Sequence, residues 1–232
     1  MLPPRLRARL LRLLPLFACG TVACSSPPPP PPAPPVDAEE IALRLEGTTQ
    51  LEQPVRIFFE WSVTERDARF SGKGVARIEP TAKARLDLFL SNGTTIARAA
   101  LVEDELRLPP GLPPGLLPPA ELMWGTLGVF RPGRFAQLRG GESLPDGRVR
   151  LLYRLPDGVE VRYTVDAGRI VELEKLRGGQ VVERVTLVPR DQDRFPTDAT
   201  YRDIAAFREL KMTRERLEEV EAFPPDIWEI TP

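Results

Sequence analysis

The sequence predicts a mainly β domain of the α+β class, with about nine to eleven antiparallel strands and a few short helices. Three observations support this prediction. Long stretches such as residues 55–64 alternate apolar and polar side chains, which is typical of half-buried strands. Two-residue turns such as Asn92-Gly93 and Asp157-Gly158 separate several of these stretches and indicate hairpins. A proline- and glycine-rich segment, residues 109–119, divides the strands into two groups.

Residues 1–24 are typical of a secretory signal segment. Four arginines, the last of them Arg12, precede an apolar run of about eleven residues, and small residues then precede Cys24. A membrane-spanning helix needs about 20 apolar residues, so this run is too short to be an ordinary span. We therefore expect residues 1–24 to direct export and to be removed.

The only two cysteines of the chain lie in this segment. Thr21-Val22-Ala23-Cys24 resembles the lipobox of bacterial lipoproteins, in which the cysteine is acylated and becomes the mature N-terminus. Cys19 is the alternative, but it leaves only about six apolar residues after Arg12, fewer than a signal core needs. We expect lipidation at Cys24. Ordinary signal cleavage without a lipid is the other interpretation.

Residues 25–36 predict a proline-rich, disordered tether. Eight of the nine residues from Pro27 to Pro35 are proline, and such a run forms a semi-rigid spacer of about 3.1 Å per residue. It would hold the next domain about 30 Å from a bilayer; the alternative is a ligand for a proline-recognition module. Because two or more acyl chains anchor stably, we expect attachment to a membrane. Ser25 after the cysteine favours the periplasmic face of the outer membrane, by resemblance to the enterobacterial sorting rule.

Charge and composition exclude several functions for the remaining domain, residues 37–232. The chain has 32 basic and 33 acidic residues, and removal of four arginines with residues 1–24 leaves 28 basic ones and a net charge of −5. A weakly acidic domain with interspersed charges has no electrostatic reason to bind nucleic acid. The chain contains no histidine, so a Ser-His-Asp triad, a His-ligated metal and a His base are absent. We expect no enzyme activity, no metal and no cofactor. The sequence predicts no particular oligomeric state.

The first half of the domain begins with a predicted helix, residues 37–46, with Asp37 as its N-cap and Gly47 as its stop. A strand at residues 55–64 follows. In the next strand Gly72 and Gly74 indicate a bend or a close approach of two backbones. The strands predicted after residue 64 are 70–78, 84–90, 94–102 and 105–108.

The second half begins with a helix-like segment, residues 120–130, which its glycines weaken. A second meander follows, with strands predicted at residues 149–155, 159–165, 169–176, 181–187, 199–203 and 207–211. Residues 213–220 predict a short helix with Thr213 as its cap. Residues 223–228 are aromatic and apolar and would pin the C-terminus to the sheet edge; docking to a partner is the alternative.

This order of elements behind a lipobox resembles the LolA/LolB-like superfamily of outer membrane lipoprotein carriers. The resemblance is carried by residues 37–47 before the strand 55–64, by the Asn92-Gly93 hairpin, and by residues 118–130 before the second meander. It covers nearly all of residues 37–232. It implies an open, strongly curved antiparallel half-barrel whose short helices cover a concave apolar face, where acyl chains are held.

The resemblance implies an apolar cavity on the concave face. Its candidate lining residues are Phe59, Trp61, Leu86, Leu88, Trp124, Leu127, Tyr153, Val161 and Tyr163. The same residues would also make an ordinary hydrophobic core, so both interpretations stay open at this point.

The chain departs from the LolB pattern in one place. LolB-type receptors insert lipoproteins through a protruding apolar loop between early strands, whereas residues 91–94 here form a short polar turn. The proline-rich loop 108–117, with Leu112, Leu116 and Leu117 exposed by its prolines, would supply an apolar tip instead. The expected function is a membrane-anchored periplasmic lipoprotein that binds a lipid or a lipoprotein acyl chain. The alternatives are an accessory or scaffold lipoprotein of an envelope assembly and a carboxylate-dependent hydrolase.

Overall fold

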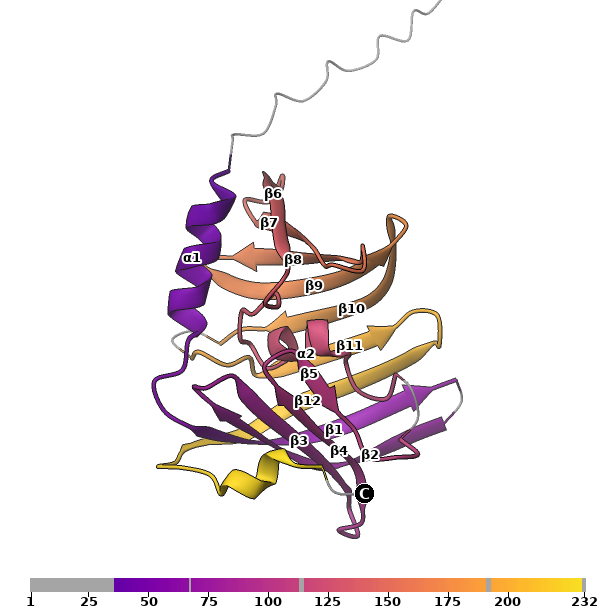
Figure 1. Ribbon diagram of the computed structural model, residues 1–232. Helices are drawn as coiled ribbons and strands as arrows, with labels where there is room; N and C mark the ends of the chain where they lie inside the picture. Colours follow the sequence, from indigo (N-terminus) through magenta and orange to yellow (C-terminus); the bar gives the residue numbers. More distant parts are fainter. Residues whose placement is uncertain (1–35, 67, 113–114, 191–192, 231–232) are drawn as a thin grey trace, which may run out of the picture. The chain divides into compact units, whose positions relative to one another are not determined.

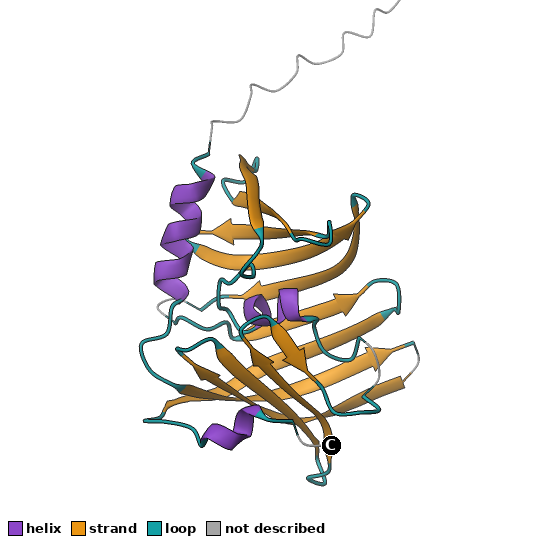
Figure 2. Cartoon of the chain, in the orientation of Figure 1, coloured by secondary structure: helices purple, strands orange, loops and turns teal. Residues whose placement is uncertain are grey.

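The computed structural model describes residues 36–66, 68–112, 115–190 and 193–230. Their strands form one twelve-stranded antiparallel sheet in the order β5-β4-β3-β2-β1-β12-β11-β10-β9-β8-β7-β6, which is open because β5 and β6 are its edges (Figures 1 and 2). The strands are β1 (Val55–Glu65), β2 (Ala68–Glu79), β3 (Lys83–Leu90), β4 (Thr95–Val102), β5 (Glu105–Arg107), β6 (Gln137–Ser143), β7 (Val149–Arg154), β8 (Glu160–Asp166), β9 (Arg169–Arg177), β10 (Gln180–Val188), β11 (Asp198–Asp203) and β12 (Arg208–Glu219). The helices are α1 (Ala38–Thr49), α2 (Ala120–Thr126) and the 3-10 helix η1 (Pro225–Trp228). The predicted open, curved, mainly β sheet is confirmed, with one strand more than the expected range.

Two meanders build this sheet and meet at β1 and β12. Strand β1 pairs with β12 from Val55 opposite Glu219 to Glu65 opposite Arg208. The first and last strands of the domain are therefore neighbours, and the two open edges belong to strands in the middle of the chain. Residues 108–136, which link the edge strands β5 and β6, have to cross from one edge of the sheet to the other. This crossing places α2 on the sheet.

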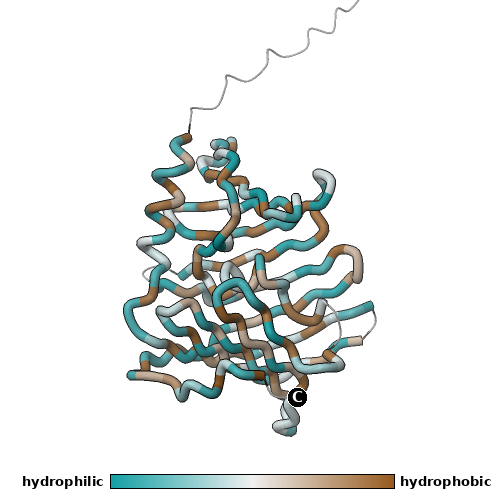
Figure 3. The backbone as a smooth tube through the Cα atoms, viewed as in Figure 1, coloured by the Kyte–Doolittle hydropathy of each residue, from teal (hydrophilic) through white to brown (hydrophobic). Residues whose placement is uncertain are grey.

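Hydrophobic and hydrophilic residues alternate along the strands as predicted (Figure 3), and every second residue of β1 from Val55 to Val63 is buried. In β1, Phe59 and Trp61 are buried in the core, whereas Phe58 points outward and lies 3.8 Å from the guanidinium carbon of Arg216. The glycine prediction is also confirmed: a Cβ on Gly72 would lie 1.9 Å from the carbonyl oxygen of Phe89 in β3. The sheet therefore requires glycine where β2 crosses the large side chains of β1.

Helix α1 begins where the sequence predicts and ends later. An Asp37 side-chain oxygen accepts a hydrogen bond from the Glu40 backbone N–H at 3.0 Å, which confirms the N-cap. The predicted stop at Gly47 is wrong, because the helix continues to Thr49. The Thr49 hydroxyl donates to the Leu45 carbonyl and accepts from the Phe130 N–H at 3.0 Å. These buried contacts of the last turn offset the roughly 1 kcal/mol penalty of a glycine inside a helix.

Replacing Asp37 with alanine is expected to lower the free energy of unfolding by about 1 kcal/mol, because the Glu40 N–H loses its acceptor. Urea denaturation followed by circular dichroism measures this change. Glu39→Ala is the matched control, since Glu39 is an exposed first-turn acid without a capping bond. An equal loss in both variants would contradict the capping role.

Two assignments of the sequence analysis are wrong. Residues 213–220 are not a helix, because β12 continues to Glu219 and pairs with β1 along its length. Backbone pairing with a neighbouring strand outweighs the local helix preference of this charged segment. The second error is an omission: strand β6 was not predicted, because Gly140 and Gly141 interrupt the alternation of its side chains. It pairs with a neighbour on one side only, as an edge strand.

The C-terminal segment packs on the sheet, although not at its edge as expected. Helix η1 lies against β3 and β4. The Arg85 guanidinium, which alternates with the inward residues of β3, donates to the Ile227 carbonyl at 2.5 Å. Phe223 and Trp228 are buried, with their rings 5.9 Å apart. The segment therefore covers the outer face of these strands. Among the described residues, no helix has the length and apolar character needed to cross a membrane.

Candidate ligand-binding site

All nine predicted lining residues are buried, and the structure brings them together in one hydrophobic cluster. They are Phe59 and Trp61 on β1, Leu86 and Leu88 on β3, Trp124 and Leu127 on and after α2, Tyr153 on β7, and Val161 and Tyr163 on β8. Strands from both meanders thus contribute to a single concave face. Their arrangement follows from the sheet order, which puts strands distant in sequence around the same core.

Helix α2 covers this face in close contact with it. A Cβ on Gly125 would lie 2.2 Å from a methyl carbon of Leu173 in β9, so only glycine lets the helix approach this closely. The indole N–H of Trp124 donates to the Glu103 carbonyl in the β4–β5 turn at 2.8 Å. A small pocket of about 40 Å³, open to solvent, lies next to Phe59 and Leu127 at the end of α2. The helix therefore fills the concave face and packs with it as one hydrophobic core.

Three aromatic rings extend the apolar layer beyond α2. Phe130, Tyr153 and Tyr163 make mutual edge-to-face contacts, with ring centroids 5.0 to 5.9 Å apart. Burial raises the pKa of the Tyr153 hydroxyl to about 12, and burial also raises the pKa of Tyr163. Among the described residues, the buried Tyr163 hydroxyl has no hydrogen-bond partner. Both phenols therefore stay neutral and belong to the apolar surface.

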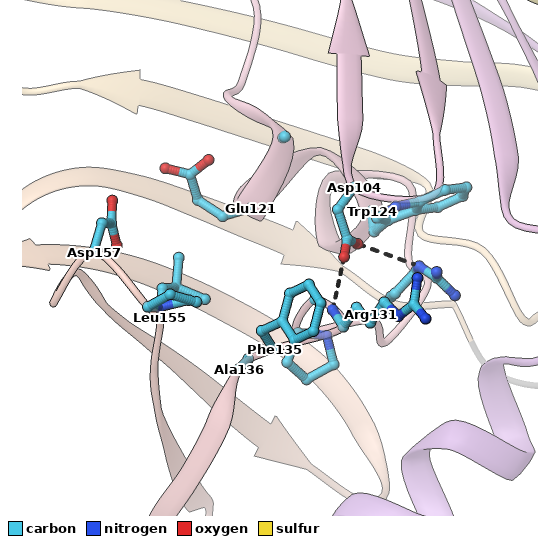
Figure 4. A pocket seen from close by; sticks show the side chains of 13 residues that line it. Asp104, Glu121, Trp124, Arg131, Phe135, Ala136, Leu155 and Asp157 are labelled. Carbon is cyan, nitrogen blue, oxygen red and sulfur yellow. Dashed lines mark hydrogen bonds and ion pairs between the residues drawn. The ribbon is translucent and has the colours of Figure 1, made fainter.

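A pocket of about 300 Å³ opens beside α2, which we call the mouth pocket. Its walls come from the β4–β5 turn, the start of α2, the segment before β6 and the β7–β8 turn. Figure 4 shows the lining residues Asp104, Ala120, Glu121, Trp124, Arg131, Pro132, Gly133, Arg134, Phe135, Ala136, Leu155, Pro156 and Asp157. The pocket thus lies between a turn of the first meander and a turn of the second, and Trp124, which also belongs to the core, connects it to the concave face.

Asp104 fastens the two sides of this opening. One of its carboxylate oxygens accepts a hydrogen bond from the Arg134 N–H at 2.7 Å, and the other lies 3.6 Å from Nε of Arg131 (Figure 4). The Arg131 guanidinium also lies 5.8 Å from the ring centre of Trp124. The β4–β5 turn is therefore bound directly to the segment that leads into β6.

A buried ionic cluster holds the start of α2 on the sheet. Nζ of Lys175 in β9 lies 2.6 Å from an oxygen of Glu121 and 3.4 Å from an oxygen of Glu183 in β10. The Lys175 side chain is only 5% exposed. Burial raises the pKa of Glu183 despite the nearby ammonium. We refer to these three residues as the lysine cluster.

The loop leucines do not form the exposed tip that the sequence analysis expected. Leu117 is buried, and Leu112 and Leu116 are half-buried against the core. The described residues of this loop therefore place the leucines against the core and not away from it. Residues 1–24, including Cys24 and Cys19, and the tether up to residue 35 lie outside the described residues, so the predictions for them are untested.

Solved structures with the same arrangement identify the fold. A LolA superfamily protein from Nitrosomonas europaea superposes with a TM-score of 0.56 at 13% sequence identity, over 84% of this chain and 98% of that chain. The domain has the LolA fold. A protein described as an outer membrane lipoprotein-sorting domain, from Vibrio parahaemolyticus, gives a TM-score of 0.50 at 9% identity, over 82% and 97% of the two chains. A DUF1329 family protein from Desulfovibrio piger gives 0.51 at 10% identity, over 83% and 95%. No protein-family model and no curated protein matches the sequence.

For this LolA fold, the alternation of apolar and polar residues predicted the buried residues that the strands contribute to the concave face. It was not sufficient to predict the mouth pocket, whose walls come from four separate loops and helix ends. One weak sign of the lysine cluster is present in the sequence. Lys175 is a charged residue two positions after Leu173 in β9, so both side chains lie on the same face of the strand. Such a residue needs a buried partner, but its identity depends on where α2 packs.

Proposed function

We propose that this protein is a lipid-anchored periplasmic protein that binds an acyl chain of a lipid or a lipoprotein. The acyl chain would enter at the mouth pocket and lie along the concave face, in the place that α2 now occupies. One observation carries this proposal: a continuous apolar face of an open sheet is covered by a seven-residue helix, beside a pocket of about 300 Å³. Small-molecule sites have volumes from about 300 Å³ upward. The LolA fold of the domain is in keeping with this role.

The energetics allow an acyl chain to replace α2. Each methylene removed from water contributes about 0.8 kcal/mol, so ten methylenes contribute roughly 8 kcal/mol. A helix of two turns has little stability of its own, and its position depends on side chains such as Leu122 and Met123. Gly128, with a φ of 82°, follows α2 and gives the chain a turning point there. The contacts of an acyl chain would therefore replace part of the apolar contacts that α2 gives up.

We propose no catalytic role. The three carboxylates of the mouth pocket are each engaged in the structure: Asp104 with Arg131 and Arg134, and Glu121 with Lys175. Asp157 accepts a hydrogen bond from the Val159 N–H at 3.1 Å and so closes the β7–β8 turn. Each acid has a structural partner, and the chain has no histidine to act as a base.

Photo-cross-linking tests the proposed site. The full lipidated chain is mixed with vesicles that contain a palmitoyl lysophospholipid with a diazirine on its acyl chain, and labelled peptides are identified by mass spectrometry. We expect labels on α2 and on the inward residues of β7 and β8. Ala136→Trp fills the mouth pocket and should abolish these labels, because Ala136 lines the pocket.

Ala222→Trp is the matched control, since Ala222 is exposed in the C-terminal segment and outside the mouth pocket. It should leave the labels on α2 unchanged. Labels confined to the outer face, or equal labelling in both variants, would contradict binding at the concave face. An accessory role in an envelope assembly would then be the better account.

The membrane anchor is a separate part of the proposal and rests on the sequence alone. Cells grown with alkyne-labelled palmitate should incorporate label into the wild-type chain and into Cys19→Ala, but not into Cys24→Ala. The unlabelled variant should lose its membrane attachment, because stable anchoring needs two acyl chains or more. Label retained in Cys24→Ala and lost in Cys19→Ala would move the anchor to Cys19.

A further inference from the structure

The turn between β11 and β12 consists of apolar residues only. Residues 204–207 are Ile-Ala-Ala-Phe, and the side chains of Ile204 and Phe207 are exposed, Phe207 by 79%. Turns are normally made by Gly, Asn, Asp, Ser and Pro. Asp203 accepts a hydrogen bond from the Ala206 N–H at 3.0 Å, which orders the turn with its apolar residues held outward. Four consecutive exposed or half-exposed apolar residues at a hairpin tip need an explanation beyond folding.

Phe207 has a left-handed backbone conformation, as Arg66, Ala82, Glu103 and Ala167 do at other turns of the sheet. Its φ is 52°, in the left-handed region where a residue with a side chain is disfavoured and glycine is not. A glycine here would make the hairpin easier to form. The protein instead has a large aromatic residue whose side chain lies mostly in solvent. What distinguishes Phe207 from these turn residues is therefore the size and exposure of its apolar side chain.

The neighbouring β1–β2 hairpin extends this tip. Glu65 at the end of β1 pairs with Arg208 at the start of β12, so these two strand ends lie side by side (Figure 1). Phe70, near the start of β2, is 57% exposed. Two exposed arginines, Arg66 and Arg69, flank it on the same hairpin. We call Phe70, Ile204 and Phe207 together with these two arginines the apolar tip.

We propose that the apolar tip inserts into the interfacial region of a bilayer that contains anionic phospholipid. Large apolar side chains beside arginines are the composition of interfacial membrane contacts, with the guanidinium groups on lipid phosphates. A protein partner fits less well, because a stable protein interface buries about 800 Å² per partner, which the ends of two hairpins do not supply. The proposed anchor and tether would keep such a bilayer within reach. The contact is distinct from the mouth pocket, and neither requires the other.

Tryptophan fluorescence of the full lipidated chain tests the contact. The three native tryptophans, Trp61, Trp124 and Trp228, are buried, so a new exposed tryptophan is the one that reports on lipid. In vesicles of phosphatidylglycerol and brominated phosphatidylcholine, Phe207→Trp is expected to shift its emission to the blue and to be quenched. Leu43→Trp is the matched control, because Leu43 is 68% exposed on α1, away from the tip. Its added emission should show neither effect.

A second variant separates bilayer contact from stability. Phe207→Gly removes the strain, so its unfolding midpoint should stay the same or rise, while quenching of a Phe70→Trp reporter should fall. If flotation shows the chain on the vesicles but Phe207→Trp is not quenched, the proposal is wrong. It is also wrong if Phe207→Gly converts a dimer to a monomer, since the tip would then bind a second copy. Cross-linking at the concave face reports on acyl-chain binding independently of both results.

Discussion

Replacing Gly72 with alanine is expected to lower the free energy of unfolding by about 3 kcal/mol or more, the upper end of the range for overpacking. The added Cβ would lie 1.9 Å from the Phe89 carbonyl oxygen and 2.9 Å from a ring carbon of Trp61. The first of these atoms belongs to the backbone of the paired strand β3, so it cannot move without disturbing the β2–β3 pairing. Urea denaturation, followed by circular dichroism, measures the loss.

Gly47→Ala is the matched control for this variant. Nothing lies within 4 Å of a Cβ placed on Gly47, and this residue is inside helix α1. Alanine there should raise the free energy of unfolding by about 0.5–1 kcal/mol, because it favours the helix over the unfolded chain. The same substitution thus has opposite effects at the two sites. A neutral result at Gly72 would mean that β2 and β3 do not pair as described.

Replacing Lys175 with methionine is expected to lower the free energy of unfolding by about 3–5 kcal/mol, because it leaves Glu121 and Glu183 without their buried cation. Lys73→Met is the matched control. Lys73 pairs with Glu215 at 2.9 Å, but its side chain is 67% exposed and water screens the pair, so the loss of stability there should be much smaller. Similar losses in the two variants would contradict a role of the lysine cluster in holding α2.

The free energy of unfolding of the Lys175→Met variant should also change with pH in a predictable direction. Burial raises the pKa of Glu183 in the folded protein above its ordinary value of 4.5, and Lys175 opposes this shift. Between 4.5 and the raised pKa, the folded state binds more protons than the unfolded state, so stability falls as pH rises through this window. Without Lys175 the window extends to higher pH. The variant should therefore lose more stability relative to wild type at pH 8 than at pH 5.

The prediction of the concave face was accurate because it depends on local periodicity. In a strand, every second side chain shares a face, so Phe59 and Trp61 fall on the same side wherever the strand lies in the sheet. The glycines of β2 were also informative, since a glycine within a strand indicates that another chain segment is close. The cap at Asp37 follows from the same kind of short-range rule.

Predictions failed where partners distant in sequence decide the conformation. Residues 213–219 favour a helix locally, but they pair with β1, about 150 residues earlier in the chain, and this pairing makes them a strand. The prolines of the loop 108–117 led to the prediction that Leu112, Leu116 and Leu117 are exposed. In the structure Leu117 is buried, and Leu112 and Leu116 are half-buried against the core. The position of a loop relative to the core is not encoded in its own composition.

The sequence by itself determined the class of the domain, its apolar face and the residues that make it, because side-chain alternation and turn chemistry act over a few residues. Only the tertiary structure decided that β1 pairs with β12 and so joins the two meanders. It also decided that Asp104 binds the segment before β6, and that Lys175 contacts Glu121 and Glu183. These contacts depend on the path of α2 between the edge strands. That path is set by the total burial of the core and not by any short segment of the chain.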